Sequence, residues 1–153
     1  MNPRIEHIDG KKFIGMQLQI SLMNNRTREL FSRFMPRRKE ILHPLRPEVY
    51  DLKIYPEDYF LNFDPQRSFT KWAAMEVGDF AQLPAGMQSF ELVGGKYAVF
   101  TPQGNGDRIF EYIFTQWLPA SSYRLDNRPH FDVLQVGSRP GEVGGEEIWV
   151  PVK

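Results

Sequence analysis

The sequence contains no cysteine, and this absence removes several classes of site. Without a thiol the chain has no disulfide framework, no thiolate nucleophile and no cysteine-type metal site. It also has no surplus of charge, because 19 lysine and arginine residues balance 19 aspartate and glutamate residues. A neutral chain lacks the basic surface by which proteins hold nucleic acid, so we expect no nucleic-acid partner.

Long apolar runs are missing as well. No segment approaches the ~20 apolar residues that span a bilayer, and residues 1–12 lack the apolar core of a signal peptide. We therefore expect a cytoplasmic protein without a membrane partner. The three histidines, His7, His43 and His130, lie far apart in the sequence without ligand-like spacing, so we expect neither a metal nor another cofactor.

Aromatic residues, in contrast, are abundant. They make up 14% of the 153 residues, with twelve Phe, six Tyr and three Trp. Such rings build cores, but they also line pockets for small molecules. The length suits one domain of ordinary size, and we assign residues 1–153 to a single domain.

Apolar periodicity predicts two similar halves, at about 5–80 and 90–153, joined by a Pro- and Gly-bearing link at 83–90. Each half runs strand, helix, strand, strand. In the first half we expect strands at 11–20, 50–56 and 69–77 and a helix at 24–41. In the second we expect a strand followed by a Gly/Asn turn at 94–104, a helix at 107–121, and strands at 130–136 and 146–152.

The two halves also align residue by residue. Asp51 is the counterpart of Asp132, and Trp72 is the counterpart of Trp149. We interpret this as an internal duplication, with chance similarity of short apolar strings as the alternative. The predicted fold is α+β, a tandem β-α-β-β duplication with pseudo-twofold symmetry. An antiparallel sheet forms its floor, two helices lie on one face, and a cleft lies at the centre.

The second half resembles the GyrI-like small-molecule-binding domain, the effector-binding module of some AraC-type and MerR-type multidrug regulators. That family's pattern is a Gly-Gly-x-Tyr strand, a helix ending Trp-Leu-Pro, an Arg-Pro-x-Phe-Glu strand and a terminal Trp-x-Pro strand. The first half resembles stand-alone members of the same family. The matching positions are Gly94, Gly95, Tyr97–Phe100, Trp117–Pro119, Ser121, Tyr123, Arg128, Pro129, Phe131 and Trp149–Pro151.

Two positions depart from the family pattern. Ser122 stands where the family has glycine, and Asp132 stands where it has glutamate. In the family this glutamate rises from the pocket floor and meets the cationic or polar part of an aromatic ligand. Asp132 keeps the charge but is one methylene shorter, so the resemblance implies binding of amphipathic, aromatic or cationic molecules with Asp132 at the base of the cleft.

The strand at 130–136 supports a buried setting for this carboxylate. Asp132 shares its face with His130 and Leu134, while Phe131 and Val133 point the other way. A strand that is apolar on both faces is buried, and charge attraction plus cation–π contact would suit a lipophilic cation there. The alternative is a structural carboxylate satisfied by Arg128, a tyrosine or backbone groups.

Further candidates follow from the aromatic residues. For the two Trp, core packing is an equal alternative to pocket lining, and the loop rings Tyr59, Phe60 and Phe63 form either a lid or a satellite core. Asp51 is expected to be a surface or structural residue. The predicted ligand-binding set is Asp132, Trp149, Trp72, Tyr112, Phe114, Tyr97 and Phe60.

A hydrolase is the alternative function. Some stand-alone relatives of the GyrI-like family open the strained cyclopropane of DNA-alkylating natural products, with the pocket glutamate as general base. In this chain Asp132 would take that part, with Tyr112 or Tyr123 polarising the substrate. The sequence names neither the natural ligand nor a protein partner.

Overall fold

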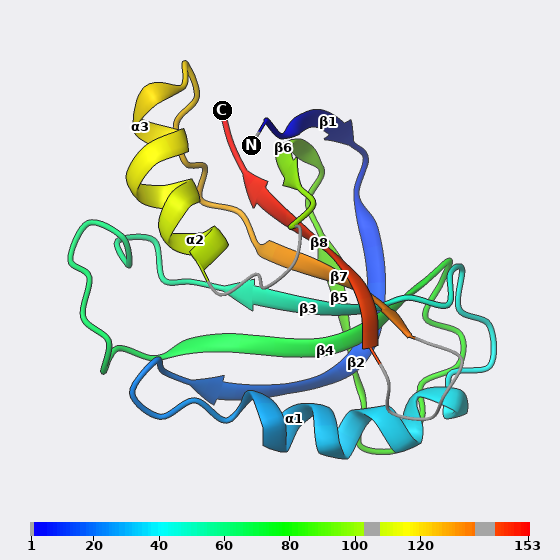
Figure 1. The fold of residues 1–153 in the computed structure, drawn as a ribbon. Coiled ribbons are helices and arrows are strands. Elements are labelled where there is room, and N and C mark those ends of the chain that lie inside the picture. The colour runs from blue at the N-terminus through cyan, green and yellow to red at the C-terminus, as the bar shows by residue number, and fades with distance from the viewer. Residues whose placement is uncertain (1, 103–107, 137–142) are drawn as a thin grey trace.

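The computed structural model describes residues 2–102, 108–136 and 143–153 (Figure 1). They form an α+β fold built on one eight-stranded antiparallel sheet, as predicted. Its order is β1-β6-β8-β7-β3-β4-β2-β5. The strands are β1 (Arg4–Ile8), β2 (Lys11–Ile20), β3 (Val49–Ile54), β4 (Phe69–Val77), β5 (Gln88–Leu92), β6 (Gly95–Phe100), β7 (His130–Val136) and β8 (Val143–Pro151).

The strand order is itself symmetric. Exchanging β1 with β5, β2 with β6, β3 with β7 and β4 with β8 gives the same order read backwards. The two strands that the sequence analysis missed, β1 and β5, lie at the two edges. Each pairs with the opposite half: β1 lies along β6, and β5 lies along β2. The expected link at 83–90 was wrong at its end, because β5 already begins at Gln88.

The first helix is shorter than predicted, and the second is irregular. α1 (Thr27–Phe34) continues into a 3₁₀ segment (Met35–Glu40), because Pro36 has no N–H to donate to the next helical turn. The second helix (109–120) consists of α2 (Ile109–Tyr112), a π-helical segment (Ile113–Trp117) and α3 (Leu118–Ala120). The expected Gly/Asn turn and the start of this helix fall on residues 103–107, outside the described residues.

The two faces of the sheet have different cores. On the helix face, α1 buries Leu30 and Phe34 against β2, β3 and β4, and the second helix buries Ile109 and Ile113 against β6 and β8. The opposite face, which we call the helix-free face, carries an aromatic core to which none of the described helices contributes. The main members of that core are Phe13, Tyr50, Leu52, Trp72, Tyr97 and Phe131, with Trp149 packed against them.

Candidate functional site

Asp132 lies at the centre of the sheet, on the helix face. The pairing of β3 with β7 places it directly opposite Asp51, its counterpart in the other half. Both side chains are buried, with 5% of Asp132 and 8% of Asp51 exposed. Of the two roles expected for Asp51, a surface or a structural residue, the surface role was therefore wrong. Directly opposed like charges destabilise a sheet, and this pair therefore needs compensation.

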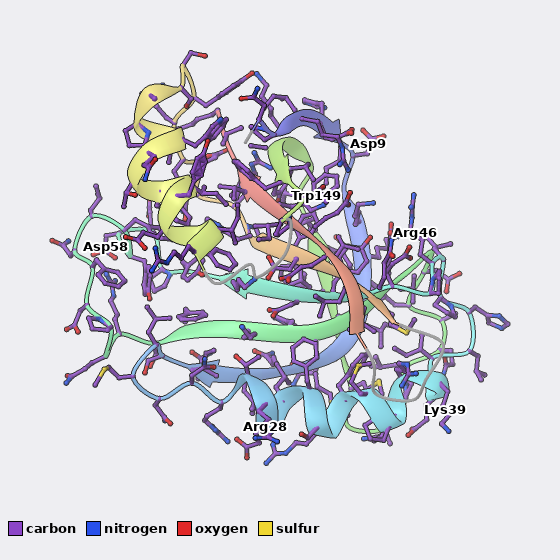
Figure 2. The ribbon with its side chains drawn as sticks, viewed as in Figure 1. Asp9, Arg28, Lys39, Arg46, Asp58 and Trp149 are labelled. Atoms are coloured by element: carbon purple, nitrogen blue, oxygen red, sulfur yellow. The ribbon has the colours of Figure 1, made fainter. Side chains whose placement is uncertain are left out.

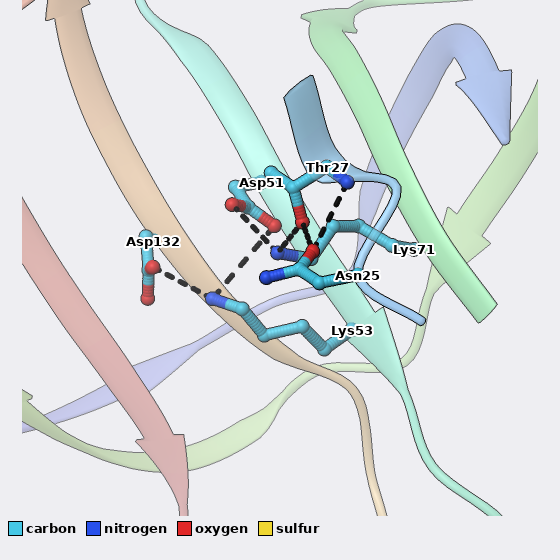
Figure 3. Close-up of polar contacts among 6 residues, drawn as sticks. All are labelled: Asn25, Thr27, Asp51, Lys53, Lys71 and Asp132. Carbon is cyan, nitrogen blue, oxygen red and sulfur yellow. Dashed lines mark hydrogen bonds and ion pairs between the residues drawn. The ribbon is translucent and has the colours of Figure 1, made fainter. Parts of the chain in front are cut away.

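Two buried lysines supply that compensation (Figure 3). Lys53 Nζ lies 2.6 Å from Asp132 Oδ2 and 3.8 Å from Asp51 Oδ1, and Lys71 Nζ lies 3.3 Å from Asp51 Oδ2. We call Asp51, Asp132, Lys53 and Lys71 the charge cluster; fully ionised, it is neutral. Arg128, the structural partner considered from the sequence, instead donates to Asp126 at 2.7 Å.

The charge cluster is tied to the start of α1. Lys71 Nζ donates to Thr27 Oγ1 at 3.0 Å, and Thr27 Oγ1 donates to Asn25 Oδ1 at 2.5 Å (Figure 3). The same Asn25 oxygen accepts the Thr27 backbone N–H at 3.1 Å. These hydrogen bonds thus connect the first residue of α1, Thr27, to the charge cluster.

The cluster keeps unused hydrogen-bonding capacity. Within the described part of the chain, Lys53 Nζ and Asp51 Oδ1 are buried and have no well-directed hydrogen bond. The contact of Lys53 with Asp132 is therefore an ion pair whose ammonium still has N–H groups to offer. Buried polar atoms of this kind are few in native proteins, and they mark candidate ligand contacts.

Burial and neighbouring charges shift the ionisation of the cluster. Burial raises the pKa of Asp132 to about 7, with the charge of Lys53 opposing the shift and that of Asp51 adding to it. Burial lowers the pKa of Lys71, which Asp51 partly offsets. Burial also disfavours the charged form of Lys53, but Asp132 and Asp51 outweigh it, so the pKa of this ammonium stays above its ordinary value.

Aromatic rings lie beside the cluster where β7 begins, at His130. Phe60, from the loop after β3, stacks on Phe114 of the second helix with ring centroids 5.3 Å apart and on His130 at 5.5 Å. Tyr55 meets His130 edge-on at 4.9 Å. Two of the predicted residues, Phe60 and Phe114, are thus brought together although 54 positions separate them in the sequence.

Another ring covers the lysine of the cluster. Lys53 Nζ lies 5.6 Å from the ring centroid of Phe110, the second residue of α2. Lys53 was not among the predicted residues. The signal that could have found it is the period of two in the strand at 50–54, where Lys53 shares a face with Asp51.

His130 makes the stability of the folded protein depend on pH. Burial and then the nearby Lys53 charge lower its pKa to about 3 from an ordinary 6.5. Below pH 6.5 the His130 imidazole binds a proton in the unfolded chain but not in the folded protein. The free energy of unfolding therefore falls as pH falls, by about 1.4 kcal/mol per pH unit. Urea unfolding at pH 7 and pH 4.5 is expected to show that His130→Gln removes about 2–3 kcal/mol of this acid loss. An equal loss in both proteins would contradict the assignment.

The remaining predicted residues lie elsewhere. Trp149, Trp72 and Tyr97 are on the helix-free face, because β7 and β8 pair Phe131 with Trp149 and Asp132 with Ile148. Trp149 stacks on Phe131 with ring centroids 5.1 Å apart. The candidates expected around one cleft are therefore divided between the two faces of the sheet.

The two tyrosines proposed for catalysis are both on the side of the second helix. Tyr112 ends α2, just before the π-helical segment, and is half-buried. Tyr123 stacks on Trp117 at 6.1 Å, and Lys96 Nζ lies 5.6 Å from its ring centroid. Tyr123 thus belongs to the packing beneath the second helix.

Two other features are absent from residues 2–102, 108–136 and 143–153. No group of three or more metal-ligating side chains gathers there. No helix in these ranges is long and apolar enough to cross a bilayer.

Comparison with known proteins agrees with this architecture. The transcriptional regulator BrlR of Pseudomonas aeruginosa is 31% identical over 112 residues, which cover 72% of this chain and 38% of that protein. The chain thus matches little more than a third of this relative's length.

Solved structures share the fold. SAV2435 bound to tetraphenylphosphonium superposes with a TM-score of 0.75 at 18% identity, over all of this chain and 94% of the other. A hydrolase encoded by lin2189 from Listeria innocua gives 0.62 at 10% identity, over 99% and 92% of the two chains. The sequence model of one protein family, Cass2, the integron-associated effector binding protein, matches residues 4–152. The chain therefore belongs to this effector-binding family.

Proposed function

We propose that the chain binds an amphipathic small molecule with an aromatic part on the helix face, over the charge cluster. The binding would serve sensing, sequestration or drug resistance. The observation that carries this proposal is the convergence of four buried charged side chains on the neighbouring strands β3, β4 and β7, with Phe60, Phe110 and Phe114 beside them. Buried polar groups with apolar surroundings are what ligand pockets use for orientation.

The charge cluster sharpens the expected ligand chemistry. Asp132 is the acidic group at the base, but Lys53 already holds it at 2.6 Å. A cationic ligand must therefore displace an internal cation, which costs affinity. A ligand that also carries an acceptor for the freed Lys53 ammonium avoids that cost, because the ammonium then keeps a partner.

The aromatic contribution can be tested with tetraphenylphosphonium, the compound bound by SAV2435. Calorimetric titration is expected to detect binding to the wild type and at least tenfold weaker binding to Phe114→Ala, because aromatic anchors dominate such sites. Phe63→Ala, in the same loop as Phe60 and 57% exposed, is the matched control and should bind like the wild type. Equal affinity of Phe114→Ala and the wild type would contradict this location.

Hydrolysis is the second candidate, favoured by one observation. A carboxyl with a pKa of about 7 is suited to general-base catalysis near neutral pH. In this reading Asp132 activates a water that opens a strained cyclopropane ring, and a tyrosine, Tyr112 or Tyr123, polarises the substrate. Following ring opening of a cyclopropane-bearing alkylator separates the two functions. Turnover that Asp132→Asn abolishes would support the hydrolase, and binding without turnover would exclude it.

A further inference from the structure

A cavity lies on the helix-free face, away from the charge cluster. Its volume is about 350 Å³, within the size range of small-molecule sites. Phe131 and Val133 line it, and they alternate along β7 with Asp132, which points to the other face. The cavity therefore has no wall in common with the site proposed above.

The floor of this cavity is aromatic. Trp149 is half-buried and stacks on Phe131 with an interplanar angle of 18°. Tyr50 continues the floor, with its ring centroid 5.7 Å from that of Phe131. Figure 2 labels Trp149 together with Arg46, another residue of the cavity wall. The Tyr50 ring is tilted by 47° to that of Phe131, so the three rings give the cavity an aromatic wall and not one flat surface.

The charges around the floor favour a cation. Four acidic side chains and three basic ones line the cavity, so one negative charge is in excess. They are Glu6, Glu48, Glu146 and Glu147, and Arg4, Lys11 and Arg46.

All three bases are already paired. Arg4 lies 2.9 Å from both Glu6 and Glu147, and Lys11 and Arg46 lie 3.3 Å and 3.7 Å from Glu76, behind the wall. The pairing of the bases leaves their charges little available to a ligand, whereas the excess acidic charge lies on the cavity wall.

Glu48, on the wall of the cavity, carries an oxygen atom without a partner. Its Oε2 is buried and has no hydrogen-bond partner among the residues that the structure describes. A buried carboxylate oxygen without a donor is unfavourable, and a bound N–H donor would remove that penalty. Because the wall carries an excess of negative charge, a donor that is itself positively charged suits this oxygen best.

The protein itself provides an example of such a contact. The guanidinium of Arg4 lies over the ring of Trp149, 5.7 Å from its centroid. A delocalised, planar N–H cation is thus already held against this ring. A ligand of the same chemistry would contact the aromatic wall beside this guanidinium and donate to Glu48.

We propose that this cavity is a second binding site, which takes an aromatic amidinium or guanidinium with its ring against the aromatic wall and its N–H groups donating to Glu48. Tetraphenylphosphonium has no N–H donor and cannot satisfy Glu48. The two sites of the protein therefore differ in ligand class as well as in position.

Benzamidine, a flat aromatic amidinium, is the probe that tests this site. Calorimetric titration at pH 7 is expected to show binding to the wild type and at least tenfold weaker binding to Glu48→Gln. Thermal unfolding should leave the Tm of Glu48→Gln near that of the wild type, because Glu48 Oε2 has no hydrogen-bond partner among residues 2–102, 108–136 and 143–153. The matched control is Glu57→Gln, an exposed residue of the loop after β3, which should bind like the wild type.

Two results would overturn the proposal: unchanged benzamidine affinity in Glu48→Gln, or loss of benzamidine binding in Phe114→Ala. The second would place the amidinium on the helix face instead. Because tetraphenylphosphonium and Phe114→Ala report on the helix face and benzamidine and Glu48→Gln on this cavity, failure of one proposal leaves the other measurable.

Discussion

Replacing Lys53 with methionine is expected to cost about 3–5 kcal/mol of unfolding free energy at pH 8, the usual penalty for breaking a buried ion pair. The variant keeps Asp51 and Asp132 directly opposite each other, with Lys71 as the remaining cation of the cluster. Two such carboxylates cannot both stay ionised, so the pKa of Asp132, already about 7, rises further. Urea unfolding measures the loss.

The same variant should recover at lower pH. A carboxyl whose folded pKa lies above its unfolded value stabilises below the unfolded pKa, and this stabilisation is lost as pH rises through the folded pKa. The difference in unfolding free energy between Lys53→Met and the wild type is therefore expected to become smaller from pH 8 to pH 5. At the lower pH a proton on the Asp132 carboxyl takes the place of the missing ammonium. A gap of the same size at both pH values would contradict the shared-charge description.

Two further variants make this test specific. Adding Asp132→Asn to Lys53→Met removes one of the opposed charges, and the double variant should regain most of the lost stability at pH 8. Lys39→Met, which removes an exposed lysine of the 3₁₀ segment, should change stability by less than about 0.5 kcal/mol.

Replacing Gly15 with alanine is expected to destabilise the protein by about 4 kcal/mol or more. A Cβ at this position of β2 would overlap the carbonyl oxygen of Ala73 and would lie 2.7 Å from Ala74 Cβ. Cβ atoms of opposed strand residues normally stand about 4.5–5.5 Å apart, so β2 and β4 approach unusually closely here. The clash involves backbone atoms, which a rotamer change cannot relieve.

Chemical unfolding of Gly15→Ala checks this prediction, with Gly78→Ala as the control. At Gly78 the nearest atom to an added Cβ is 3.7 Å away, so that substitution should be close to neutral. A stable Gly15→Ala protein would mean that the two strands can separate locally without loss of the sheet.

The sequence allowed much of this fold to be predicted, because apolar periodicity reports strands and helices that bury one face. β2, β3, β4, β6, β7 and β8 were anticipated in this way. The edge strands were missed: β1 is polar along most of its length, and β5 is short and follows a Pro- and Gly-bearing segment. Edge strands bury little apolar surface, so their sequences carry little of the signal on which periodicity depends.

The site was harder to predict, because it depends on register. Matching the halves correctly identified Asp51 and Asp132 as counterparts, but whether counterparts touch depends on which strands lie at the symmetry axis. The pairing of β3 with β7 makes them neighbours. Register likewise separates Trp149 from Asp132, since adjacent residues of a strand point to opposite faces. A single sequence shows which side chains of a strand share a face, but it does not show which residues of the neighbouring strand lie opposite them.

The exchange of edge strands has a consequence for the order in which the protein is assembled. β1 is synthesised before β6, its hydrogen-bonding partner, which follows about ninety residues later in the chain. During synthesis on the ribosome β1 must therefore wait, without this partner, until β6 has emerged. Termination of translation before β6 leaves a fragment in which β1 has lost its neighbour in the sheet.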